Sequence, residues 1–435
     1  MHFVEESYFY SILSEKRYHK TYRFKFVIMP INNRTSISVK LFMTFCLVFG
    51  LFLCEALKMR GYSYVDEVIA LLLSSYLFIS MLRNQLFDAH LLKAFYVFSG
   101  VFFFYYIYSW MIGVNPNGIN MSFVVHIKPF LTFFSVLMIG FTLDNHFKRY
   151  LSNLTLLLSI GCLVIALTGR IFIFYHHPAY FAMTVSCLAL YYYYTSQDSF
   201  TNSMISIGIM AIALFSFRMK AVGFFILFVA IVMFYNEKVK FRFNIKNTFI
   251  LLSSLAIIYY YAKDKIFFYF INPYSEENLE SAGRASLYVT SLDVLNDYLP
   301  FGPGFGTYAD IGAALNYSPL YYKYQLDSVF GLSPNNGMYL CDTFFPDLAQ
   351  FGIVGICIFF YFWYWIFVLL RRNYRKNGNL KLFKIGLLII GFLMIESTTA
   401  TTFVQSQGLM VMFLLALVLY EGKSNNNAYE PFRFY

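Results

Sequence analysis

The feature that most constrains this chain is a series of apolar stretches, most of them close to the length of a membrane crossing. A helix needs about 20 apolar residues to cross the hydrocarbon core of a bilayer, and every backbone polar group there must be satisfied within the structure. Of the 435 residues, 59% are hydrophobic and only 13% are charged, so a single aqueous core cannot bury the apolar surface. We therefore predict an all-α polytopic membrane protein and exclude a soluble enzyme, a disordered chain and a disulfide scaffold.

These stretches predict about 12 transmembrane helices, and most are close to the roughly 20 residues of a membrane crossing. Several are short for a full crossing, which indicates tilted or broken helices. The pair at 204–217 and 219–235 is interrupted only by Arg218-Met219-Lys220. The stretches lie at residues 38–57, 64–82, 92–112, 121–143, 151–167, 179–195, 204–217, 219–235, 248–263, 346–370, 385–402 and 408–420.

Basic residues indicate the orientation, because Lys and Arg favour cytoplasmic loops. The segments 236–247 and 371–384 are the richest in Lys and Arg, and both are cytoplasmic if the N-terminus is inside. The net charge of +10 therefore reflects membrane orientation, and we expect no nucleic-acid partner. The predicted organisation is a cytoplasmic tail at 1–37, spans one to nine at 38–263, a large periplasmic loop at 264–345, spans ten to twelve at 346–420, and a cytoplasmic tail at 421–435.

The long loop at 264–345 is acidic and lies between the ninth and tenth predicted spans. A structureless loop of this length is uncommon unless it is functional or folded on itself. Residues 285–298 have the apolar spacing of a helix, and the glycine-rich run 302–306 follows as a tight turn. We therefore expect a partly helical outer loop.

Outward-facing cations are the first candidates for chemistry. Arg170 follows the fifth span, Arg218 and Lys220 interrupt an apolar hairpin, and Arg284 lies in the long loop. Ionisable groups at membrane depth are costly and usually face a cavity or a partner, and the guanidinium fork grips phosphate. Together these residues predict a site for a lipid-linked phosphate or pyrophosphate. The alternative is that each cation reaches the interface or forms a structural ion pair.

Three further groups lie on the same predicted face. His176 and His177 could orient a phosphate or act as acid and base; alternatively, one is solvated and the other caps the next span. Asp342 could be a general base for a sugar hydroxyl or an N-cap near Pro346. Glu396, in the outer half of the eleventh span, would pair with one of the arginines.

The chain carries no spacing typical of a metal site. The six cysteines fall mostly inside apolar runs, and no Asp-x-Asp pair or His/Cys cluster occurs along the sequence. The Gly302–Gly306 run follows no strand and is not a nucleotide loop. We therefore expect neither a metal nor a cofactor.

The order of these features resembles the O-antigen polymerase and O-antigen ligase superfamily. Segment LFSFRMKAVGFFILF at 214–228 is similar to the superfamily's arginine motif between two spans, and YHHPAYFAMTVSCLAL at 175–190 to its mid-chain proline span. GRASLYVTSLDVL at 283–295 and LPFGPGFGTYAD at 299–310 resemble its loop helix and the glycine segment after it. DTFFPDLAQFGIVGICIFF at 342–360 resembles the segment where the chain returns to the membrane. The resemblance covers about residues 90–420.

The resemblance implies a metal-independent membrane glycosyltransferase that acts on glycans carried by undecaprenyl pyrophosphate, on the periplasmic side of a bacterial inner membrane. It assigns Arg218 and Arg284 to the donor pyrophosphate, with Arg170 as a looser match. Ligases carry a catalytic histidine late in the loop, and residues 264–345 contain none. This departure favours the polymerase branch, with Asp342 as the candidate base.

We therefore expect a polysaccharide repeat-unit polymerase, of O-antigen or capsule. Arg218, Arg284 and Asp342 would be catalytic, and a chain-length regulator protein would be a partner by analogy. The substrate-binding candidates are Arg170, Lys220, His176, His177 and the loop tyrosine Tyr308. Two alternatives stay open: a ligase that moves finished glycan onto a lipid acceptor, and a flippase or transporter of lipid-linked oligosaccharide.

Overall fold

The computed structural model describes residues 36–61, 64–83, 87–235 and 279–424, and all of them belong to one unit of the chain. The predicted tail at 1–37 lies outside this part except for its last two residues, and most of the tail at 421–435 does too. The expected ninth span at 248–263 and the beginning of the long loop also lie outside it.

Helices form nearly all of the regular structure in the described ranges, where the β structure is one isolated bridge between Ser333 and Asn336. The first half contains α2 (Ile37–Phe45), the π-helical turn η1 (Cys46–Phe52), α3 (Cys54–Lys58), α4 (Val65–Leu82), α5 (Ala89–Ile112), α6 (Pro116–Ile139), α7 (Asn145–Leu167), α8 (Ile171–Tyr175), α9 (Pro178–Thr195), α10 (Phe200–Ile212), η2 (Ala213–Ser216), α11 (Met219–Val229) and η3 (Ala230–Phe234). The second half contains α13 (Leu279–Asp297), α14 (Ile311–Leu315), α15 (Pro319–Lys323), η6 (Leu326–Ser328), α16 (Phe344–Asp347), η7 (Leu348–Phe351), α17 (Gly352–Asn377), α18 (Leu380–Glu396), η8 (Thr402–Val404) and α19 (Ser406–Ser424).

Six helical segments in the described ranges are long and apolar enough to cross a membrane. They are α4, α5, α6, α7, the segment Phe344–Asn377 that ends with α17, and Ser406–Lys423 within α19. The prediction of an all-α membrane protein is confirmed at this level. Every expected stretch inside the described ranges also coincides with helical structure, but the total of twelve crossings stays a prediction.

Several predicted spans are broken helices. The first is divided into α2, η1 and α3. Helix α10 ends in the 3₁₀ turn η2, and Phe217 then adopts a left-handed conformation with φ of 53° before α11 begins. A left-handed residue reverses the chain direction in the manner of a helix C-cap. The hairpin predicted around Arg218 is therefore a sharp turn between two helices.

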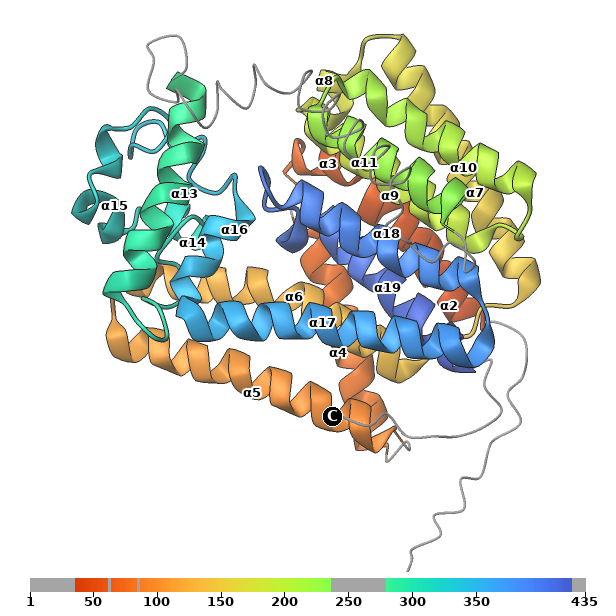
Figure 1. The fold of residues 1–435 in the computed structure, drawn as a ribbon, viewed down its shortest axis with the longest axis horizontal. Coiled ribbons are helices and arrows are strands. Elements are labelled where there is room, and N and C mark those ends of the chain that lie inside the picture. Colours follow the sequence, from red (N-terminus) through yellow and green to blue (C-terminus); the bar gives the residue numbers. More distant parts are fainter. Residues whose placement is uncertain (1–35, 62–63, 84–86, 236–278, 425–435) are drawn as a thin grey trace, which may run out of the picture. The chain divides into compact units, whose positions relative to one another are not determined.

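Helices α6 and α19 form the centre of the bundle, and α5 lies at its edge (Figure 1). In the most apolar 18 residues of each helix, 83% of the residues of α19 and 72% of those of α6 are buried, against 17% in α5. Lys128 on α6 is buried but paired, since its Nζ contacts Asp66 and lies 2.7 Å from Glu67 Oε1 at the start of α4. Charges inside the bundle are thus compensated between helices.

Residues 279–345 fold around a small apolar cluster of their own, which includes Leu287, Tyr308, Tyr321 and Leu332. This segment contacts the N-terminal end of α6 through α14. At Gly306, φ is +74° and an added Cβ would meet the backbone of Gly118, so only glycine permits the approach. The described part of the expected loop contains the helices α13, α14 and α15, while the large outer loop as a whole stays a prediction.

Candidate functional site

Arg284 and Asp342 form the first pair of the site. Arg284 lies on α13, and Asp342 lies just before α16. The guanidinium donates from Nε to Asp342 Oδ2 at 2.8 Å and from Nη2 to the same oxygen. It also lies over the ring of Tyr339, with Cζ 4.6 Å from the ring centroid. The N-cap of α16 is Thr343, so Asp342 does not cap this helix and its carboxylate is committed to Arg284.

Arg218 and His177 form the second pair. Arg218 precedes α11, and its Nη2 lies 2.5 Å from His177 Nε2. His177 is the N-cap of α9 and accepts a hydrogen bond at Nδ1 from Ala179 N at 3.2 Å. His176 is exposed with φ of 57°. The alternative interpretation of the two histidines, one solvated and one capping, therefore describes their placement, yet the capping histidine also faces the arginine.

Lys220 and Glu396 form the third pair, with Nζ 2.8 Å from Oε2. The Glu396 side chain is only 2% exposed. The expectation that an arginine would neutralise Glu396 was wrong. Lys220 lies in the first turn of α11, which packs against α18, so its side chain is directed at the end of that helix while Arg218 is directed at His177.

The three pairs share one electrostatic environment. Burial, together with the positive charges of Arg218, Lys220 and Arg284, lowers the pKa of His177 to about 4. Burial also raises the pKa of Asp342, against the charges of Arg284, Lys220 and Arg218. Three cations therefore act on both groups, although they come from α11 and α13, which are far apart in the sequence.

The contact between His177 and Arg218 is polar but poorly matched. A neutral imidazole carries one N–H. Nδ1 accepts from the backbone of α9, so the proton belongs on Nε2, and it then faces the N–H groups of Arg218. An oxygen anion bound beside these two donors could accept a hydrogen bond from each. The site therefore has the electrostatics of an anion site and two N–H donors for the anion.

Two predicted residues lie apart from these pairs. Arg170 is exposed at the N-cap of α8, and no contact in the described part of the chain joins it to the three pairs. Tyr308 is fully buried in the apolar cluster of residues 279–345, where its hydroxyl donates to the Leu287 carbonyl at 2.7 Å. A side chain with no exposed surface is not available to stack on a sugar, so the role expected for Tyr308 is withdrawn.

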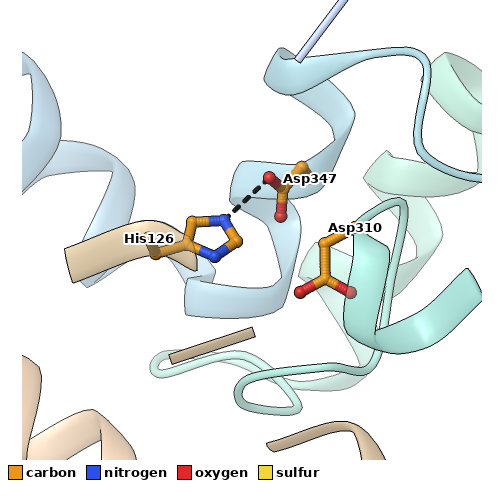
Figure 2. Close-up of side chains that lie close together, drawn as sticks. All are labelled: His126, Asp310 and Asp347. Atoms are coloured by element: carbon orange, nitrogen blue, oxygen red, sulfur yellow. Dashed lines mark hydrogen bonds and ion pairs between the residues drawn. The ribbon is translucent and has the colours of Figure 1, made fainter. Parts of the chain in front are cut away.

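The structure also assembles a buried cluster that the sequence did not indicate. His126 on α6, Asp310 at the N-cap of α14 and Asp347 at the end of α16 come together, as Figure 2 shows. One donor atom from each lies within 4.8 Å of the other two, and His126 Nε2 is 2.9 Å from Asp347 Oδ2. These residues are separated by up to 221 positions, so no spacing rule could have linked them.

Comparison with protein-family models gives no match. Comparison with curated proteins gives none either.

Proposed function

We propose that this protein is a polysaccharide repeat-unit polymerase of a bacterial cytoplasmic membrane, with its active site on the outer face. It would transfer a growing glycan from undecaprenyl pyrophosphate onto a lipid-linked repeat unit. The single observation that supports this proposal is the convergence of Arg218, Lys220, Arg284, His177 and Asp342. Each is a candidate for chemistry with a pyrophosphate-linked donor. Contacts join Arg218 to His177 and Arg284 to Asp342, and the charges of Arg218, Lys220 and Arg284 act on both His177 and Asp342.

The donor pyrophosphate would bind first. Its oxygens would accept from the Arg218 guanidinium and from His177 Nε2–H, which resolves the mismatch between these two donors. They would also compete with Asp342 for the Arg284 fork, because an arginine grips phosphate and carboxylate with the same geometry. Binding of the donor would therefore release the Asp342 carboxylate from its ion pair.

The groups in the site account for every bond and proton of the transfer step. The acceptor hydroxyl oxygen attacks the anomeric carbon of the donor glycan, and the bond from that carbon to the pyrophosphate oxygen breaks. The released Asp342 takes the hydroxyl proton, a role that contributes typically 10²–10⁴-fold. Arg218 and Arg284 stabilise the negative charge that develops on the leaving pyrophosphate. No metal takes part in these steps.

The test is genetic and uses surface polysaccharide from a strain without this gene, complemented with wild type, Arg218→Ala, Arg284→Ala or Arg371→Ala. Arg371 lies exposed on α17 in the predicted cytoplasmic segment and is the matched control. Loss of the polymer ladder with single repeat units still attached to the acceptor supports a polymerase. Both site variants should fail to restore the ladder, and the control should restore it.

Other patterns would contradict the proposal. Loss of every surface repeat unit, with lipid-linked polymer accumulating, would identify a ligase. An unchanged ladder in the strain without the gene would remove both transferase functions and favour a transporter. Full complementation by Arg218→Ala and Arg284→Ala would show that the pyrophosphate site lies elsewhere.

A further inference from the structure

The buried cluster of His126, Asp310 and Asp347 takes no part in the function proposed above. Its members are 5%, 2% and 0% exposed, and they join three elements: α6, the N-terminus of α14 and α16. Buried charges are costly unless they are paired or coordinate a metal. The hydrogen bonds around the cluster indicate that a positive charge is needed among its three members.

Both nitrogens of the His126 ring face oxygens that only accept. Nδ1 lies 2.8 Å from the Ser122 carbonyl oxygen, and Nε2 lies 2.9 Å from Asp347 Oδ2. A neutral imidazole has one N–H and can satisfy one of them. If Nδ1–H donates to the carbonyl, a positive species must lie between Nε2 and the carboxylate. That species is either a proton or a metal ion.

The charge of the two carboxylates favours the metal ion. Asp310 caps α14 by accepting from Ala313 N at 2.7 Å, and its other oxygen accepts from the Ser122 hydroxyl. Both Asp310 oxygens therefore act as acceptors, as in an ionised carboxylate, and Asp347 accepts from Gln350 as well as facing His126. One imidazolium would leave the cluster with a net charge of −1, whereas a divalent cation with neutral His126 makes it neutral.

The donor set also fits a metal. Imidazole nitrogen and carboxylate oxygen are the ligands that bind Zn²⁺ at about 2.0–2.2 Å, and related divalent ions accept the same mixture. Donor atoms within 4.8 Å of one another can reach a common ion through small side-chain rotations. A metal-bound histidine usually donates its other N–H to a carbonyl or carboxylate, and His126 Nδ1 has the Ser122 carbonyl in this position.

We propose that His126 Nε2, Asp310 and Asp347 bind a structural divalent transition-metal ion, such as Zn²⁺ or Mn²⁺. The rings of Phe351 and Phe305 pack against His126, with centroids at 5.4 and 5.9 Å, so the site is closed off from bulk solvent. The ion would fasten the segment 279–345 to the helical bundle and would not act on substrate. It is compatible with a transferase that uses no metal in its reaction.

The first test measures metal in wild-type protein that has been purified in detergent without a polyhistidine tag. Elemental analysis should find about one divalent transition-metal ion per chain. Removal of that ion by a strong chelator should lower the thermal unfolding midpoint, and adding Zn²⁺ or Mn²⁺ back should restore it. Wild-type protein that holds no such ion, and that unfolds at the same temperature with and without chelator, would overturn the proposal in favour of an imidazolium between two carboxylates.

The second test assigns the ligands. His126→Gln and Asp310→Asn should lose the ion, whereas the control Asp297→Asn should keep it. Asp297 is an aspartate of the same folded segment that pairs with Lys323 at the surface, with 39% of its side chain exposed. Stoichiometric metal that persists in both ligand variants would also overturn the assignment. If a variant does not fold, the chelation experiment on wild type still decides, and neither readout depends on polymerase activity.

Discussion

The pH dependence of His177 offers a direct test of the cationic site. Its pKa lies at about 4 instead of the ordinary 6.5, because of burial and the charges of Arg218, Lys220 and Arg284. Between these two values the unfolded chain binds a proton that the folded chain does not, so stability falls as the pH drops from about 6.5 towards about 4. Above the unfolded pKa this contribution does not change with pH.

The size of the effect follows from the shift. Each pKa unit corresponds to about 1.4 kcal/mol, so the full shift would correspond to about 3 kcal/mol. The ring is only partly buried, and solvent screening reduces such contributions substantially. We therefore expect wild type to lose about 1–2 kcal/mol through His177 between neutral pH and about pH 4.5.

The variant that tests this expectation is His177→Asn. Asparagine caps a helix well, so it can keep the hydrogen bond from Ala179 while removing the titrating ring. The unfolding free energy of the detergent-solubilised protein is measured at neutral pH and at about pH 4.5. Between these pH values, His177→Asn should lose about 1–2 kcal/mol less stability than wild type. His176→Asn, which changes the exposed neighbour, should behave like wild type.

The result that would refute this reasoning is an equal loss of stability in wild type and His177→Asn. Inorganic pyrophosphate provides a second measurement on the same proteins. An anion bound beside Arg218 and His177 offsets the cations and raises the pKa of the ring, so pyrophosphate should shrink the difference between wild type and His177→Asn. A difference that does not change with pyrophosphate would show that no anion binds there.

Three further predictions concern neighbouring residues. Lys220→Met should destabilise the protein by about 3–5 kcal/mol because it leaves the buried Glu396 unpaired, and Lys220→Met/Glu396→Gln should recover most of that loss in a double-mutant cycle; equal losses in both would contradict the pairing. Arg284→Lys should abolish polymer despite keeping the charge, since lysine cannot form the forked contact with the donor pyrophosphate; a normal ladder would show that charge alone suffices. Tyr308→Phe should cost about 1–2 kcal/mol of stability by removing a buried hydrogen bond while the ladder keeps its pattern, and a changed ladder with unchanged stability would return Tyr308 to the substrate site.

The sequence predicted the helices and the candidate site residues Arg218 and Arg284 from local signals. A long apolar run in a membrane folds as a helix because its backbone polar groups must be satisfied within the segment, and each expected stretch inside the described ranges coincides with helical structure. Arg218 and Arg284 could be selected because an arginine in an apolar or otherwise acidic context stands out by itself. The turn between α10 and α11 could also be predicted, because Arg218-Met219-Lys220 interrupts two apolar stretches.

Only the tertiary structure decided which groups face each other. The direction of Lys220 towards Glu396, instead of an arginine, depends on how α11 packs against α18. The burial of Tyr308 depends on the apolar cluster around it. His126 and Asp347 meet across 221 positions, and each is an unremarkable residue in its own segment. Contacts of this kind are set by packing between distant helices, and a linear pattern carries no record of that packing.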